Sequence, residues 1–289
     1  MSIWRVLILA FVQGLTELLP VSSSAHVVVT EKLMGLDPSS PEMTLLLVML
    51  HTGTMFAVIL YFWKQWKRAF FESGAAFKSF ALLLILATAF TGVVGEILNK
   101  IIEKFWFHSA ANAEVEELFS HLELIAPALF VGGILILIAG ALEKRAAIAS
   151  AAGGVGLNAK QASLIGFVQG LCLPFRGFSR SGATISTGML AGVAKVRAEE
   201  FSFALAVVLT PAVVARELLR LVKAEHVSGS AALASAMLPG IFGAFCAFVA
   251  GLLALKWLSK WLEGGRWYLF GLYCLAAAVV VAVLHHAGF

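Results

Sequence analysis

The stretch FVQGLTELLPVSSSAH, residues 11–26, places a carboxylate, three consecutive hydroxyls and an imidazole in a chain that is 60% hydrophobic. Only 13% of the residues are charged, and the mean hydropathy is +0.92. A soluble domain with this composition would expose too much apolar surface to water, so the sequence indicates an integral membrane protein. A polar cluster within such a chain calls for a specific structural or chemical reason.

Several apolar segments are long enough, at about 20 residues, to cross the hydrocarbon core of a bilayer as helices. Six such spans are expected, at about 43–63, 79–98, 124–142, 200–222, 233–257 and 267–284. Their residues are apolar on both parities, which argues against the alternating pattern of a transmembrane β-barrel. Residues 3–35 and 161–194 are interrupted by Gly, Pro, Ser and charged residues, so we expect two re-entrant helical hairpins there.

The two interrupted regions resemble each other in sequence. The pentapeptide FVQGL occurs at 11–15 and again at 167–171, and the serines at 22–24 align with SRS at 179–181. A broken element followed by three spans therefore occurs twice, which is typical of a duplicated membrane protein. We expect one membrane domain over residues 1–289, with repeat one at about 1–150 and repeat two at about 151–289.

An odd number of spans in each repeat makes the second repeat enter the membrane from the opposite side. The sequence thus predicts an all-α integral membrane protein with an inverted-topology repeat. Lys and Arg are more frequent around 64–78, 144–160, 195–197 and 256–266 than on the opposite predicted face. Because cationic loops stay in the cytoplasm, we expect both termini and the loop at 99–123 to face outwards.

In this arrangement the tips of the two hairpins meet near the midplane of the bilayer. Polar residues of both halves converge there: Glu17, Ser22, Ser23, Ser24 and His26 from the first, and Ser179, Arg180, Ser181 and Thr184 from the second. An unpaired charge at the bilayer centre costs at least ~2.5–3.5 kcal/mol. The opposite signs of Glu17 and Arg180 therefore predict that these two side chains lie close together.

The second hairpin contains RGFSRSGAT at 176–184, with two guanidiniums and several hydroxyls before a helical run. Arg side chains and the N–H groups of a helix start are typical phosphate ligands. The first hairpin adds a carboxylate that could hold a divalent cation, hydroxyls that could attack phosphorus and an imidazole that could move a proton. Together they favour phosphoryl transfer to a hydroxyl or to water, whereas a purely structural role would leave the buried charges unexplained.

Several other residues have plainer interpretations. His51 lies inside an expected span and could line the cavity, although a packing role is favoured, and the three cysteines are interpreted as packing groups. Gln13 and Gln169 occupy equivalent positions and suit either interhelical hydrogen bonds or ligand binding. The cluster YFWKQWK at 61–67 is typical of an anchor at the membrane interface.

Two long motifs carry a family resemblance. QGLTELLPVSSSAH at 13–26 and GFSRSGATIS at 177–186 resemble the two signature regions of the bacterial undecaprenyl-pyrophosphate phosphatase family, also called the bacitracin-resistance family. EEFSF at 199–203 agrees with it as well, so the resemblance covers essentially the whole chain. It implies a multi-pass inner-membrane hydrolase that converts undecaprenyl diphosphate to the monophosphate and recycles the carrier of cell-wall glycans. The site would face the periplasm.

The resemblance also implies roles for individual residues. By matching motif positions, the catalytic residues are Glu17, Ser23, His26 and Arg180. The substrate phosphates would contact Ser22, Ser24, Ser179, Ser181, Thr184, Arg176 and Gln13. Glu17 would hold the divalent cation, Mg²⁺ or Ca²⁺. Undecaprenyl diphosphate and membrane lipids are the expected partners, with no nucleic acid, and a homodimer stays open.

The chain departs from the family pattern at two points. Gln13 stands where many relatives have Glu, which puts a metal site with two carboxylates in doubt. Phe175 and Arg176 separate Pro174 from Gly177, which adds a second cation near the phosphates. Ser23, His26 and water all stay open as the nucleophile. A lipid-phosphate transporter or flippase is the alternative function, because inverted repeats with broken elements are also a transporter architecture.

Overall fold

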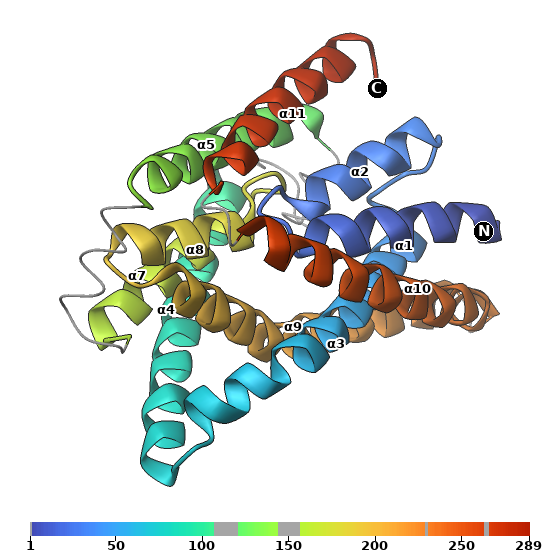
Figure 1. The fold of residues 1–289 in the computed structure, drawn as a ribbon. Coiled ribbons are helices and arrows are strands. Elements are labelled where there is room, and N and C mark those ends of the chain that lie inside the picture. Colours follow the sequence, from blue (N-terminus) through green and yellow to red (C-terminus); the bar gives the residue numbers. More distant parts are fainter. Residues whose placement is uncertain (1, 107–120, 144–156, 229–230, 263–265) are drawn as a thin grey trace.

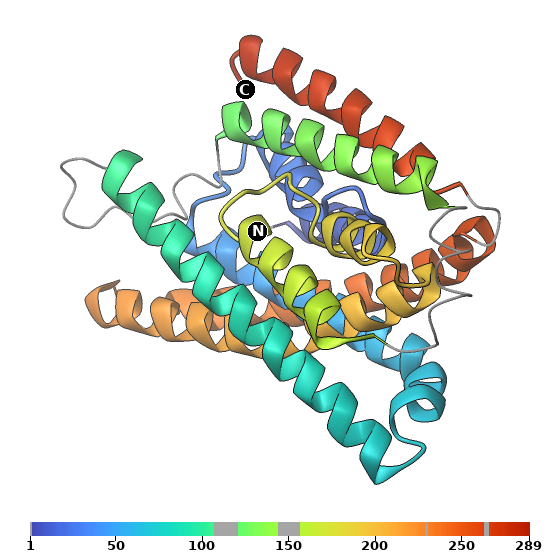
Figure 2. The ribbon, with the colours of Figure 1, turned by 90° about the vertical axis from the view of Figure 1, so that its left-hand side faces the viewer.

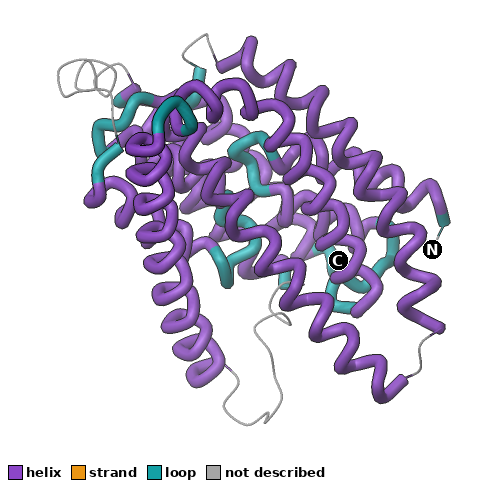
Figure 3. Tube along the Cα trace, turned by 90° about the horizontal axis from the view of Figure 1, so that it is seen from below, coloured by secondary structure: helices purple, strands orange, loops and turns teal. Residues whose placement is uncertain are grey.

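The computed structural model describes residues 2–106, 121–143, 157–228, 231–262 and 266–289, and all regular structure in them is helical (Figures 1 and 3). In chain order the helices are α1 (Ile3–Glu17), α2 (Ser23–Leu33), α3 (Pro41–Phe70), α4 (Gly74–Trp106), α5 (Leu122–Ala141), α7 (Ala159–Cys172), α8 (Arg180–Leu190), α9 (Lys195–Ser228), α10 (Ala231–Leu262) and α11 (Tyr268–His286). The prediction of an all-α protein is confirmed.

Six of these helices are long and apolar enough to cross a membrane. They are α3, α4, α5, α9, α10 and α11, which confirms the six expected spans by length and composition. Most of them extend beyond the apolar runs from which they were predicted: α3 continues to Phe70, and α9 begins at Lys195. Helical hydrogen bonding continues into the flanking polar residues, whereas hydropathy marks only the part that suits the hydrocarbon core.

The first interrupted region forms a hairpin of α1 and α2. The tip between them contains Pro20, and Ser22 has φ of 67°, the one non-glycine residue with positive φ among the described residues. The Ser22 hydroxyl accepts a hydrogen bond from the N–H of Ala25 and so caps α2. At the open end, Arg5 donates to the carbonyl of Met34, which holds the start of α1 beside the end of α2.

The second interrupted region repeats this construction with α7 and α8. Its tip contains Pro174, and Gly177 has φ of +109°. A Cβ at Gly177 would lie 2.6 Å from the carbonyl oxygen of Ile125, so this tip needs glycine for both conformation and space. Ser179 caps α8 by accepting from the N–H of Gly182, and Gln161 donates to the carbonyl of Ala191 at the open end.

The two tips touch. Ser181 at the start of α8 donates to the carbonyl of Leu19, and Cys274 of α11 contacts the carbonyl of Pro20. The cysteines at 172, 246 and 274 are free, and two of them are buried. The thiol of Cys274 thus helps to fix α11 against the first tip.

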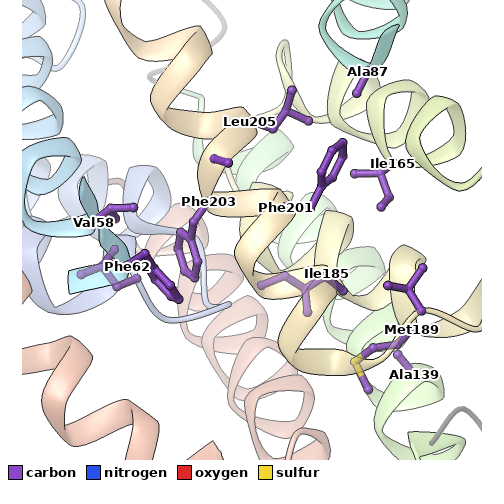
Figure 4. Close-up of a cluster of buried hydrophobic side chains, with 14 of the residues drawn as sticks. Val58, Phe62, Ala87, Ala139, Ile165, Ile185, Met189, Phe201, Phe203 and Leu205 are labelled. Carbon is purple, nitrogen blue, oxygen red and sulfur yellow. The ribbon is translucent and has the colours of Figure 1, made fainter. Parts of the chain in front are cut away.

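The largest hydrophobic cluster lies where α3, α7, α8 and α9 come together. Phe203 of α9 stacks on Phe62 of α3 at 5.1 Å between ring centroids, and Phe201 lies near Ile165 and Ile185 (Figure 4). Leu18 and Val21 of the first tip belong to the same cluster. The polar tip is therefore supported by a packed apolar layer.

Part of the predicted interfacial anchor at 61–67 belongs to this core instead. Trp66 is buried, with 7% exposure, and its indole N–H donates to the carbonyl of Glu200 on α9. Phe62 is buried too, while Trp63 is exposed. The run covers two helical turns, so its residues face both the core and the outside, and only part of it can be an anchor.

Two further helices cover the hairpins on another side. Figures 1 and 2 both show α5 and α11 side by side, near the first hairpin. At the start of α11, the indole N–H of Trp267 donates to Ser186 of α8 at 3.1 Å. Together with the contact between Cys274 and Pro20, this bond fixes α11 to both hairpins.

The repeated FVQGL motif has an equivalent packing role in both hairpins. A Cβ at Gly14 would lie 2.5 Å from the Cβ of Ala250 on α10, and one at Gly170 would lie 2.7 Å from the Cβ of Val94 on α4. Both glycines thus permit close helix contacts, as small residues do in membrane proteins. The neighbouring Gln13 and Gln169 are both fully buried.

Candidate functional site

Glu17, the last residue of α1, is the centre of the site. Its Oε1 accepts a hydrogen bond from Nη2 of Arg180 at 2.5 Å, so the predicted contact between the two hairpins is present. Its Oε2 accepts from the Ser23 hydroxyl and, at 3.0 Å, from Nε2 of Gln13. The Glu17 side chain is only 10% exposed. Donors from both hairpins therefore compensate a carboxylate that is almost out of reach of solvent.

His51 of α3 completes this group of donors, and the predicted packing role for it is wrong. Its Nε2 lies 3.4 Å from Oε2 of Glu17, and its Nδ1 lies 2.8 Å from the carbonyl oxygen of Leu47. Both ring nitrogens thus face acceptors, and a neutral imidazole has only one N–H to donate. His51 therefore brings α3 into contact with the Glu17 carboxylate. Sequence periodicity could not reveal this contact, because it joins residues on different helices.

Arg180 is the first residue of α8, and only part of its guanidinium is used in the contact with Glu17. Its Nη1 is buried and has no hydrogen-bond partner in the part of the chain that the structure describes. A buried donor without a partner is costly, and a guanidinium suits two oxygens of one phosphate group. Arg180 can therefore hold Glu17 with one nitrogen and an anionic ligand with the other.

Ser23 is the hydroxyl best placed for chemistry. It is the first residue of α2, is 8% exposed, and donates to the same carboxylate that Arg180 contacts. Ser23 and Arg180 are the first residues of α2 and α8, so two helix N-termini, which favour negative charge, meet at Glu17. A phosphoryl group at the junction of the tips would therefore meet a hydroxyl, a guanidinium and two helix N-termini.

Other hydroxyls of the predicted set make structural hydrogen bonds. Ser22 and Ser179 cap α2 and α8, and Ser181 donates to the first tip. Thr184 contacts the carbonyl of Arg180 and, at 2.6 Å, the hydroxyl of Ser202. Ser24 lies 3.4 Å from the hydroxyl of Ser22. These groups shape the tips, and Ser23 is the one in contact with Glu17.

His26 lies on the same helix as Ser23 but contacts other partners. Its Nδ1 is 2.7 Å from the carbonyl oxygen of Ser22, and its Nε2 is 2.7 Å from the hydroxyl of Tyr273 on α11. The two rings are stacked, with centroids 5.6 Å apart. The structure thus places Ser23 against Glu17 and His26 against Tyr273, a residue that sequence reasoning did not single out.

Arg176 lies in the second tip and interacts electrostatically with Glu31 of α2. Glu31 is 1% exposed, and burial raises its pKa to about 7, an effect that Arg176 partly offsets. The predicted second cation thus lies beside a second buried carboxyl group, which the family motifs do not include. Glu31 lies near the end of α2, outside both motifs, so no sequence signal indicated it.

A narrow opening lies beside Glu17, between α3 and α9. Its lining includes His51, Arg180 and Thr210. The exposed edge of the site therefore lies between two membrane-spanning helices, where a lipid-borne group could reach it.

The fit of a divalent cation can be tested on these residues. Among the described residues, no group of three or more His, Cys, Asp or Glu side chains could hold a metal ion. Both oxygens of Glu17 already accept from protein donors, while Oε1 of Gln13 is buried without a described hydrogen-bond partner. The oxygens present fit a cation that brings most of its ligands with it, as Mg²⁺ does when it is bound through substrate phosphates.

These features define a class: a multi-pass helical membrane protein with a buried site, at the junction of two hairpins, suited to a phosphate-bearing ligand. The family follows from comparison with known proteins. The chain belongs to the bacitracin resistance protein BacA family, whose model matches residues 6–280.

Named relatives agree with this family. An undecaprenyl-diphosphatase 2 of Acinetobacter baylyi is 56% identical over 288 residues, covering 98% of each chain. An undecaprenyl-diphosphatase 2 of Burkholderia thailandensis is 36% identical over 290 residues, covering 96% of this chain and 95% of the relative. An undecaprenyl-diphosphatase 1 of Burkholderia pseudomallei is 35% identical with the same coverage. These names describe phosphatases and give no support to the carrier alternative.

Proposed function

We propose that this membrane phosphatase hydrolyses undecaprenyl diphosphate to undecaprenyl monophosphate and phosphate, which recycles the lipid carrier and confers resistance to bacitracin. One observation carries the proposal: Arg180 joins the two hairpins at Glu17, the carboxylate that Ser23 also contacts, and its buried Nη1 has no hydrogen-bond partner among the described residues. A carrier of lipid phosphates could use Arg180, but it has no need for a hydroxyl in contact with a buried carboxylate.

In the proposed reaction the diphosphate lies between Arg180 and the starts of α2 and α8. Ser23 Oγ forms a bond to the terminal phosphorus, the bond from phosphorus to the bridging oxygen breaks, and the prenyl monophosphate leaves with that oxygen. The Ser23 proton passes to Glu17, the acceptor that it already contacts. Water then attacks the phosphoserine, the bond from phosphorus to Ser23 Oγ breaks, and the proton held by Glu17 returns to Ser23 as phosphate leaves.

Most of the catalytic effect in this site would be electrostatic. The phosphoryl group carries its charge on three oxygens, and preorganised donors stabilise that charge without reorganising during the reaction. A divalent cation, Mg²⁺ or Ca²⁺, would arrive with the diphosphate and neutralise part of its charge, with Glu17 and Oε1 of Gln13 as the protein oxygens able to hold it.

Phosphate release from detergent-purified protein with a prenyl diphosphate tests the function, since hydrolysis needs no sealed vesicle whereas transport does. Arg180→Ala and Glu17→Ala should abolish release. Lys195→Ala is the matched control, because Lys195 forms an ion pair with Glu143, apart from the tips, at 3.1 Å. Release that is unaffected by Arg180→Ala, or affected equally by Lys195→Ala, would contradict the proposed site.

Rapid-quench trapping with labelled substrate tests the nucleophile. A labelled phosphoserine at Ser23 that is lost in Ser23→Ala supports the covalent route. Label on His26 would show that His26 is the nucleophile instead. Full burst turnover without any adduct would show that water attacks directly.

We further propose that the two hairpins are re-entrant, that the halves form an inverted repeat in the inner membrane, and that the site opens to the periplasm. The support is the equivalent construction of the hairpins, the contact of their tips and the excess of cationic residues in the loops on one face. Single cysteines placed at the exposed residues Ser39 and Glu72 test the topology. In intact cells a membrane-impermeant maleimide should label Ser39→Cys, while Glu72→Cys should react only after lysis.

A further inference from the structure

We infer that Tyr273 is a positioning residue for His26, and that the hydroxyl of Tyr273 is the path by which His26 exchanges its proton. This inference rests on the proposed phosphatase function and deepens it. Tyr273 belongs to neither signature motif, and it lies on α11, 247 residues from His26 along the chain.

The hydrogen bonds of His26 fix which ring nitrogen is basic. A carbonyl oxygen only accepts, so Nδ1, 2.7 Å from the carbonyl oxygen of Ser22, carries the proton. In a neutral imidazole the lone pair is then on Nε2, and the Tyr273 hydroxyl at 2.7 Å donates to it. The nitrogen that could act as a base is therefore covered by Tyr273.

The backbone of the first tip holds the carbonyl in this position. Ser22 has a left-handed φ of 67°, a conformation that is unfavourable for a residue other than glycine. That turn directs its carbonyl at the imidazole while its hydroxyl caps α2. Local strain at a tip that also carries Ser23 fits a conformation kept for orienting His26.

Tyr273 is itself held from its own side. The next residue, Cys274, contacts the carbonyl of Pro20, and Trp267 at the start of α11 is bonded to Ser186. The ring of Tyr273 stacks on His26 with an interplanar angle of 12°. Because α11 is fixed to both hairpins, the hydroxyl is placed by rigid elements rather than by a loop.

These contacts suggest how a proton would move. The attacking water of the second step gives a proton to the Tyr273 oxygen while the Tyr273 proton passes to Nε2, which leaves an imidazolium and an intact tyrosine. A hydroxyl both donates and accepts, so after the transfer Tyr273 can accept from Nε2–H. A phenyl ring in its place could stack on His26 but could do neither.

Tyr273→Phe is the test, because it removes one oxygen and keeps the stacking ring. Tyr268→Phe is the matched control: Tyr268 lies on the same helix and is similarly exposed, at 42% against 48% for Tyr273. A hydrogen bond to a group that becomes charged predicts a 10- to 100-fold lower kcat for Tyr273→Phe, with little change in KM. Tyr268→Phe should behave like the unchanged protein.

The second readout needs no substrate. Diethyl pyrocarbonate reacts with an unprotonated imidazole nitrogen, so uncovering Nε2 should make the His26 peptide react several-fold faster in Tyr273→Phe, as followed by mass spectrometry. His26→Gln identifies the peptide. Unchanged reactivity of His26 or unchanged kcat in Tyr273→Phe would each overturn the inference. A protein that releases no phosphate would refute the proposed function, while the labelling rate would still report on the contact between Tyr273 and His26.

Discussion

Gln13→Glu tests how strongly the site disfavours a second carboxylate beside Glu17. Nε2 of Gln13 donates to Oε2 of Glu17 at 3.0 Å, so the change replaces a donor with a second carboxylate at that distance. Gln13 is fully buried.

The size of the effect follows from Coulomb's law. Two unit charges about 3 Å apart repel by roughly 5 kcal/mol at an effective dielectric constant of ~20. Arg180 and His51 both contact Glu17 and offset part of this repulsion, which leaves a cost on the order of 2–4 kcal/mol. For a protein of this size that cost lowers Tm by roughly 5–15 °C in a metal chelator. A proton or a divalent cation shared by the two carboxylates would remove it.

Thermal unfolding in detergent, without substrate, measures the effect. Addition of Ca²⁺ or Mg²⁺ should raise the Tm of Gln13→Glu, since a ligand at 100 times its Kd stabilises by about 2.7 kcal/mol. The unchanged protein should respond weakly, because both oxygens of Glu17 already accept from protein donors. Gln169→Glu, at the equivalent position of the other hairpin, is the control for a buried acid away from Glu17. An equal response to Ca²⁺ in the unchanged protein and Gln13→Glu would refute the reasoning.

Three further outcomes are expected. Arg180→Lys should lower kcat by about 10²- to 10³-fold in the phosphate-release assay, because a single ammonium cannot hold Glu17 and a phosphate together; activity close to normal would show that one point charge suffices. His51→Ala should lower kcat about 10-fold, and His51→Gln, which keeps a donor, should recover part of it; equal losses would show that the donor is not what matters. Glu31→Gln should flatten the pH dependence of Tm. In the folded protein the pKa of Glu31 is about 7, above its ordinary value of 4.5, so neutral Glu31 stabilises the fold fully below pH 4.5. About 3 kcal/mol of this folding free energy is lost as the pH rises through 7. The difference between Tm at pH 5 and Tm at pH 8 should therefore be smaller in Glu31→Gln. An unchanged difference would show that other groups cause the pH dependence.

The fold could be predicted from the sequence to the extent that each element carries its own signal. Six spans followed from apolar runs of the length that a bilayer requires, and both interrupted regions followed from Pro, Gly and Ser within otherwise apolar sequence. Helix ends could not be predicted closely, because α3 and α9 continue through polar residues where hydropathy has already fallen. Likewise Trp66 has the composition of an interfacial residue but the position of a core residue, and only the helix face distinguishes the two.

The site divides in the same way. Glu17 and Arg180 were expected to meet because a buried charge needs a partner, and they do. Tyr273 could not be found, and the contact of His51 with Glu17 could not be predicted, because each residue meets the motif from another helix. The partners of Ser23 and His26 could not be predicted from the motif that contains both residues. The structure directs Ser23 to Glu17 and His26 to Tyr273, because side chains three positions apart share a helix face only broadly.

The equivalent positions of the two hairpins show what a duplicated element can and cannot share. Gly14 and Gly170 serve the same purpose, because both hairpins need one close helix contact. Gln13 and Gln169 have diverged in partner: Gln13 donates to Glu17, and Gln169 donates to Thr91 of α4. Two identical tips would bring like charges together at one buried point, and such a junction would be unstable. A carboxylate from one tip and a guanidinium from the other stabilise the junction and leave a spare donor for a phosphate, so the same asymmetry that holds the hairpins together also makes the site reactive.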